Sequence, residues 1–207
     1  MAVLPLRTLG DPVLRTPAQE VPALDARIVQ LVEDMYQTMD AAGGIGLAAP
    51  QIGVGLRIFT FDAAGSRGAV INPELSLTGP IGPTPREPSR PAEGENLLRE
   101  GCLSVDGVYS PVDRSQTVVL TGTTPEGAAV HVEAAGLLAA CFQHEVDHLD
   151  GRLFIDRLTG EDRRHAMRAL REPSAGGKGP QRRAAGAGPE SRPDAGSGSS
   201  FFAGPRT

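Results

Sequence analysis

The sequence predicts an α+β fold in which antiparallel sheets pack around a central metal-binding helix. Three observations carry this prediction. Two segments have apolar residues at helical spacing, four short segments have strand composition, and the second helical segment contains two histidines four residues apart. Strand and helix segments do not alternate regularly, so a parallel doubly wound sheet fits poorly.

The helical segments are marked by spacing and by end signals. The first helix is predicted over about residues 25–41 and is stopped by Gly43. The second is predicted over about residues 134–149. A third, weaker helix is expected to start after Thr159, a plausible N-cap, and to run towards residue 170.

Strand composition is found in four segments, residues 56–61, 69–72, 117–121 and 129–133. In the last of them Val130 and Val132 alternate with polar residues, as in a strand with one buried face. Residues 79–96 (GPIGPTPREPSRPAEGEN) are dense in proline and polar residues, so we expect an exposed or mobile insertion without a regular element.

Domain organisation follows from these composition shifts. We expect one catalytic domain over residues 1–172, interrupted by the proline-rich insertion at about residues 79–96. Residues 173–207 are mostly Gly, Pro, Ala, Ser and Arg with little apolar content, which predicts a disordered tail.

Composition excludes several classes of function. The net charge of −5 gives no broad basic field, which argues against nucleic acid as the main partner. The N-terminus has no secretory signal and no segment is long enough to span a membrane, so we expect a cytoplasmic protein with free cysteines. Lys178 is the only lysine, which is typical of a GC-rich bacterial genome.

The segment QHEVDHLDG at residues 143–151 is the strongest signal of chemistry. His144 and His148, four residues apart on a predicted helix, project from one face and can reach one metal ion. Glu145 lies beside them, close enough to take a proton from a metal-bound water. The other face of this helix is apolar, which disfavours the alternative of two solvated histidines.

A catalytic metal site needs a third protein ligand and an open position for water. A third histidine of the pattern HExxHxxGxxH is missing, because Phe154 stands in its place. Glu172 is disfavoured because it borders the expected tail, and Cys141 because three ligands from one helix would enclose a metal poorly. Cys102 in EGCLSV is the better candidate, although a free cysteine taken alone is more often a buried apolar residue.

The segment GIGLAAPQ at residues 44–51 follows the first predicted helix. Its small residues allow close approach of another backbone, and the Gln51 amide can donate a hydrogen bond to a developing oxyanion. By itself this signal is weak, because glutamine is usually a surface residue.

Together, GIGLAAPQ, EGCLSV and QHEVDHLDG, in this order and spacing, resemble the three signature motifs of the peptide deformylase family. The resemblance extends to GDPVLR at residues 10–15, INPE at 71–74 and LFIDRL at 153–158, so it covers roughly residues 4–170. It implies a metal-dependent hydrolase that removes the formyl group from the N-terminal formyl-methionine of newly made polypeptides and releases formate.

The resemblance also implies a role for single residues. One divalent metal ion is expected, Fe(II) first with Zn, Ni or Co as substitutes. The implied metal ligands are Cys102, His144 and His148. The implied catalytic groups are Glu145, Gln51 and the backbone N–H of Leu103, and the implied substrate-binding backbones are Ile45, Gly46 and Gly101.

The sequence departs from the family pattern at two positions, and two other functions have to be weighed. Asp106 stands where many relatives have proline and Tyr109 where some have arginine, which affects peptide preference more than chemistry. A zinc endopeptidase is disfavoured by the missing third histidine, and a non-catalytic peptide- or ribosome-binding relative by the intact set of site residues. Ribosome contact through Arg182 and Arg183 of the tail stays open, with solvated arginines the more ordinary interpretation.

Overall fold

The computed structural model describes residues 2–87, 89 and 91–171. Glu172 and the predicted tail at residues 173–207, with Arg182 and Arg183, lie outside the described residues. Among the helices that are described, none is long and apolar enough to cross a membrane.

The larger sheet has five strands in the order β1-β2-β3-β8-β9, and all neighbouring strands are antiparallel. Its strands overlap all four segments that were predicted from composition, although β2 begins two residues later than predicted. Only the three-residue strand β1, which holds a glycine and has no apolar period, was not predicted. The bounds are Gly46–Ala48 for β1, Ile58–Ala63 for β2, Ser66–Leu77 for β3, Thr117–Thr123 for β8 and Ala129–Ala135 for β9.

Two further sheets each have two short antiparallel strands, β4 with β7 and β5 with β6. The bounds are Ile81–Pro83 for β4, Glu100–Cys102 for β5, Val105–Ser110 for β6 and Asp113–Ser115 for β7. Strand β4 and the 3-10 helix Gly94–Asn96 lie inside the proline-rich insertion, so the prediction that it lacks regular elements was wrong.

Most of the described residues of the insertion are exposed, although two of its polar side chains are buried. Thr84 and Asn96 are buried, and Asn96 accepts a hydrogen bond from the backbone N–H of Glu87. Prolines are tolerated here because β4 is short and pairs with β7 along one edge.

Three α-helices complete the fold at nearly the predicted positions. The bounds are Ala26–Ala42 for α1, Gly136–Leu149 for α2 and Gly160–Ala169 for α3. Asp25 caps α1 by accepting hydrogen bonds from the first backbone N–H groups, and Gly43 ends it in the left-handed conformation with φ 66°. Short 3-10 helices lie at Pro12–Arg15, Ala49–Ile52 and Phe154–Asp156.

The larger sheet separates two apolar clusters because successive side chains of β2 point to opposite faces. Ile58 packs with Met35 and Met39 of α1, whereas Phe59 and Phe61 pack with α2. A third cluster joins β6 to the 3-10 helix Phe154–Asp156 and to α3.

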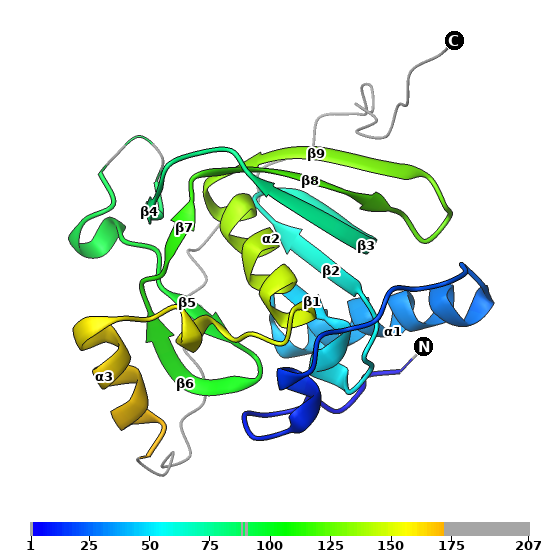
Figure 1. The fold of residues 1–207 in the computed structure, drawn as a ribbon, viewed down its shortest axis with the longest axis horizontal. Coiled ribbons are helices and arrows are strands. Elements are labelled where there is room, and N and C mark those ends of the chain that lie inside the picture. Colours follow the sequence, from blue (N-terminus) through cyan, green and yellow to red (C-terminus); the bar gives the residue numbers. More distant parts are fainter. Residues whose placement is uncertain (1, 88, 90, 172–207) are drawn as a thin grey trace, which may run out of the picture.

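Helix α2 lies in the middle of the molecule, with the larger sheet on one side and the β5–β6 pair and α3 on the other (Figure 1). Its residues are therefore covered from both sides. The predicted α+β class, with antiparallel sheets around a central helix, is confirmed. This arrangement brings β1, β5 and α2, which come from the three sequence motifs, to one place.

Candidate metal centre

The thiol of Cys102 and the imidazoles of His144 and His148 form one cluster, in which one ligand atom from each residue lies within 4.8 Å of the other two. The Sγ of Cys102 is 3.2 Å from the Nε2 of His148. Ligands of a tetrahedral zinc with ordinary bond lengths are separated by roughly 3.3 to 3.6 Å. The donor set and its size therefore fit a single transition-metal ion.

The cluster is built from two elements that are far apart in sequence. Cys102 ends β5, while His144 and His148 lie one turn apart on α2 and project from one face of that helix. His148 is buried, and burial lowers the pKa of its imidazole well below the ordinary value. A neutral imidazole is the form that binds metals.

Cys141, the competing thiol, is not part of this cluster. It is buried among apolar side chains of the α2 side of the larger sheet, and its Sγ donates to the Ile45 carbonyl at 3.5 Å. Burial raises the pKa of this thiol well above its ordinary value. Phe154, which stands where a third histidine would be, stacks beside His144 with ring centroids 6.1 Å apart.

Glu145 lies next to the cluster with its carboxylate buried, and burial raises its pKa to about 7. A carboxyl group with such a pKa can both accept and release a proton near neutral pH. Among the described residues, its Oε2 is one of two buried side-chain polar atoms without a hydrogen-bond partner, and the other is Nδ1 of His148. Unpaired buried polar atoms of this kind mark a place where a ligand or water can bind.

Gln51 is buried at the end of the first motif, and its amide is held in one orientation. Its Oε1 accepts a hydrogen bond from the backbone N–H of Ala48 at 2.7 Å, which directs Nε2 towards Cys102 Sγ at 3.6 Å. Leu103 follows Cys102 directly, and its side chain packs against the α1 side of the larger sheet. The structure thus brings both predicted oxyanion donors beside the thiol.

Gly46 lies on β1, at the edge of the larger sheet, and directly against Glu145. A Cβ atom at position 46 would lie 2.2 Å from Glu145 Oε1, so a side chain there would displace the Glu145 carboxylate. The preceding carbonyl of Ile45 accepts from the Asp62 N–H of β2. Because hydrogen bonding alternates along an antiparallel strand, the Gly46 backbone groups face away from β2, towards the open edge.

Gly101 lies on β5, between Glu100 and the thiol. A Cβ atom at this position would lie 2.4 Å from Cε1 of Tyr109, so the tyrosine ring covers the place where a side chain would be. Tyr109 itself is 46% exposed, and Ile45 is 38% exposed. Two large and partly exposed residues thus lie next to the glycines of the site, Tyr109 against Gly101 and Ile45 directly before Gly46.

Sequence reasoning missed four charged residues behind the cluster: Glu100, Arg114, Asp147 and Arg157. Glu100 Oε2 lies 3.0 Å from Nδ1 of His144. Burial alone would raise the pKa of Glu100, but hydrogen bonds from Arg114 and His144 outweigh it and hold the pKa at about 2. A signal for Glu100 existed, since residues 100 and 102 of one strand share a face. For Arg114 and Asp147 the sequence carries no such signal.

Comparison with known proteins agrees with the three motifs. Residues 3–164 match the family model described as polypeptide deformylase. A peptide deformylase of Acidothermus cellulolyticus is 47% identical over 172 residues, which cover 83% of this chain and 88% of that protein. A peptide deformylase of Parafrankia sp. is 48% identical over 173 residues, with 83% and 87% covered.

Solved structures resemble this fold as well. A peptide deformylase from Legionella pneumophila superposes with a TM-score of 0.71 at 36% identity and covers 82% of this chain and 94% of that one. One from Synechococcus elongatus, in complex with actinonin, gives 0.71 at 37% identity and covers 82% and 85%. The matches span the motifs that supply the cluster, and the chain therefore belongs to the polypeptide deformylase family.

Proposed function

We propose that this chain hydrolyses the formamide of N-formylmethionyl peptides, the reaction for which its family is named. One observation carries the assignment to this site: a cysteine and two histidines surround a space of metal size, with a buried carboxylate beside them whose Oε2 has no partner. In the overall reaction, water adds its oxygen to the formyl carbon, the carbon–nitrogen bond breaks, and formate and a free amine leave.

Cys102, His144 and His148 are proposed as the metal ligands. A bound divalent ion would act as a Lewis acid that lowers the pKa of a water molecule and polarises the formyl oxygen. Fe(II) is the proposed ion, with Zn, Ni or Co able to take its place, because one thiolate and two imidazoles suit all of these borderline metals. A thiolate beside Fe(II) makes the site sensitive to oxidation.

Glu145 is proposed as the proton shuttle. Its carboxylate lies against Gly46, so it faces the edge along which a peptide backbone can approach. With a pKa of about 7 it can take a proton from the attacking water and pass it to the leaving nitrogen.

Gln51 and the N–H of Leu103 are proposed to stabilise the oxyanion that develops on the formyl oxygen. The fixed Gln51 amide supports this role, because a donor that is already oriented needs no reorganisation as charge develops.

The substrate backbone is proposed to lie along the open edge of β1 and against β5, contacting Ile45, Gly46 and Gly101. The edge position of β1 supports this, because an extended peptide can add to an exposed strand by main-chain hydrogen bonds. The missing side chains at Gly46 and Gly101 leave room for the Glu145 carboxylate and the Tyr109 ring, which therefore lie directly against the backbone along which the peptide is proposed to bind.

Newly made polypeptides are the proposed partners, which places the activity in the cytoplasm where they emerge from ribosomes. Direct contact with the ribosome is a further part of the proposal. A groove on α3 and the residues directly after it supports this contact, because it is lined by four arginines and such a surface attracts phosphates: Arg163, Arg164, Arg168 and Arg171. We expect co-sedimentation with ribosomes that falls steeply as the salt concentration rises. Absence of co-sedimentation at low salt would contradict direct contact with the ribosome.

The test is formate release from a formyl-Met peptide by protein purified without oxygen, with metal analysis of the same sample. We expect turnover, one equivalent of divalent metal, and no cleavage of the same peptide without its formyl group. Peptide-bond cleavage without formate release would instead identify an endopeptidase, and metal-free turnover would contradict the proposed site.

A further inference from the structure

A buried chain of alternating charges runs behind the metal centre through Glu100, Arg114, Asp147 and Arg157; we call it the ionic chain. Arg114 donates from Nε and Nη2 to the two carboxylate oxygens of Glu100 at 2.7 and 2.8 Å. Its third nitrogen, Nη1, donates to Asp147 Oδ2 at 2.7 Å. Arg157 donates from Nε to the same Oδ2 at 2.6 Å.

The ionic chain connects the two elements that carry the proposed ligands. Glu100 belongs to β5, which ends with Cys102, and Asp147 belongs to α2, between His144 and His148. Arg114 comes from β7 and contacts both carboxylates at once. Its guanidinium therefore bridges the strand that carries the thiol and the helix that carries the imidazoles.

The inner end of the ionic chain acts on one ligand directly. Glu100 Oε2 lies 3.0 Å from His144 Nδ1, so an Nδ1–H donates to the carboxylate and the Nε2 lone pair is left for the cluster. The same Glu100 is held on both oxygens by Arg114, which removes its freedom to rotate. The orientation of the His144 ring thus depends on Arg114 through Glu100.

Burial indicates that this arrangement serves more than stability. The side chain of Arg114 is 1% exposed, and those of Glu100 and Asp147 are 9% and 4% exposed. Ion pairs buried to this extent are often no more stabilising than apolar residues of the same volume. Lysine cannot replace this arginine, because a single ammonium does not reproduce three directed donors in one plane.

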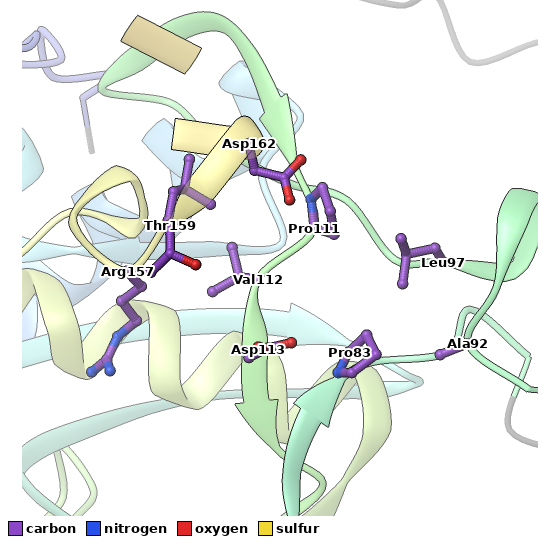
Figure 2. A pocket seen from close by; sticks show the side chains of 10 residues that line it. Pro83, Ala92, Leu97, Pro111, Val112, Asp113, Arg157, Thr159 and Asp162 are labelled. Atoms are coloured by element: carbon purple, nitrogen blue, oxygen red, sulfur yellow. The ribbon is translucent and has the colours of Figure 1, made fainter. Parts of the chain in front are cut away.

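The outer end of the ionic chain reaches solvent at Arg157, whose side chain is 41% exposed. Arg157 lines a cavity of about 210 Å³ between the proline-rich insertion and α3. Figure 2 shows its guanidinium directed away from Pro83 and Leu97 on the far side of this cavity. Arg157 is thus the exposed and less constrained member, and its loss is expected to matter less than that of Arg114.

We propose that Arg114 is a positioning residue of the metal centre, which fixes the spacing between Cys102 and the two histidines and, through Glu100, the orientation of the His144 ring. The proposal rests on the proposed metal ligands. It assigns to Arg157 a supporting role through Asp147.

The test compares Arg114→Lys with a matched control, Arg57→Lys. Arg57 also pairs with a carboxylate at the end of α2, donating to Asp150 at 2.9 Å, but it does not contact Glu100 or Asp147. Cobalt(II) is loaded into each protein, and its loss to a chelator is followed by the visible absorption of the site. Thermal unfolding of the metal-free proteins is measured in parallel.

We expect Arg114→Lys to lose cobalt roughly 10- to 100-fold faster than wild type, with an altered ligand-field spectrum, and Arg57→Lys to match wild type. Glu100→Gln should give a similar acceleration, and the double variant should be little worse than either single one, because both act along one path. Arg157→Lys should show a smaller acceleration.

Equal cobalt loss from Arg114→Lys and Arg57→Lys, with unchanged spectra, would overturn the proposal. If Arg114→Lys does not fold, Glu100→Gln and Arg157→Lys decide by the same measurement, and wild-type rates in both would overturn it. Failure of the proposed metal ligands is distinguishable, because then wild type itself would bind no cobalt through Cys102, and failure of the proposed reaction is distinguishable, because it would show as absent formate release with cobalt binding unchanged.

Discussion

Helices α1 and α2 lie on opposite faces of the larger sheet and bury very different side chains. Helix α1 buries Val32, Met35 and Met39, together with Thr38, whose hydroxyl donates to the Asp34 carbonyl and accepts from the Leu4 N–H. Helix α2 buries apolar residues too, but its C-terminal half adds four buried polar ones, Gln143, Glu145, Asp147 and His148.

This difference separates residues that stabilise the fold from residues that serve the site and lower the stability of the fold. Burying apolar surface is favourable, whereas burying a polar group is costly unless it is fully hydrogen-bonded. The buried polar group of α1 is fully paired, and so are Gln143 and Asp147 of α2. Glu145 and His148 each retain an unpaired atom. Unpaired buried atoms of this kind are retained where a functional site uses them. Substitutions of the buried apolar residues of α1 should therefore change stability, whereas substitutions of the unpaired residues of α2 should change activity.

The largest expected effect is that of Glu145→Gln on turnover. Removing the proton acceptor should lower kcat by about 10² to 10⁴-fold, because general acid–base catalysis contributes that much. Metal content and the free energy of unfolding should stay near those of wild type. Formate release and elemental analysis check this, and turnover within a few-fold of wild type would remove Glu145 from the mechanism.

On α1, Met35→Ala should act on stability alone. Met35 is fully buried, so its truncation should lower the free energy of unfolding by about 2 to 5 kcal/mol. The kcat/KM of the folded protein should not change. Denaturant unfolding measures the loss, with Val29→Ala, at a position 42% exposed on the same helix, as the control that should unfold like wild type.

Gly46→Ala should reduce activity with little change in metal content. The new methyl group would collide with Glu145 Oε1, and a displaced catalytic group costs about 10²-fold in rate. Peptide kinetics and elemental analysis check this. Gly55→Ala, where an added Cβ meets nothing within 4 Å, should keep full activity, and equal activity of both variants would contradict the expected collision.

Gln143→Leu should have the smallest effect, confined to stability. Its amide accepts from the Ser115 N–H and donates to the Ser115 carbonyl, so leucine would leave these buried groups unpaired at a cost of about 1 to 3 kcal/mol. Thermal and denaturant unfolding measure it, with the exposed Gln30→Leu on α1 as control. A loss as large as that of Met35→Ala would mean that Gln143 does more than pair Ser115.

Sequence patterns predicted the long elements and the cluster, for identifiable reasons. Helix α1 begins one residue from its predicted start because Asp25 caps it, and the apolar period of α2 stops at Leu149 as predicted. The spacing of His144 and His148 needs only helix geometry. The strands of the two small sheets and β1 were not predicted. Strands β1 and β5 have only three residues, one of them a glycine, and carry no period, and β4 lies in the proline-rich insertion.

The sequence could not predict contacts between residues that lie far apart along the chain. Arg114 meets Glu100 and Asp147 only because β7, β5 and α2 converge, and nothing in the residues near position 114 indicates this. The prolines of the insertion predict an irregular segment, yet β4 pairs with β7, which follows the insertion in sequence. The prediction of Cys102 as the third metal ligand depended on the resemblance to the family motifs and not on the residues around it in the sequence.

The most direct measurement of the central claim is the near-ultraviolet charge-transfer band of the cobalt(II) protein, which reports a thiolate bound to the metal. The band should be present in wild type and in Cys141→Ser, and it should be lost, with a sharp fall in metal content, in Cys102→Ser. A band that persists in Cys102→Ser and disappears in Cys141→Ser would contradict the metal centre described for Cys102, His144 and His148.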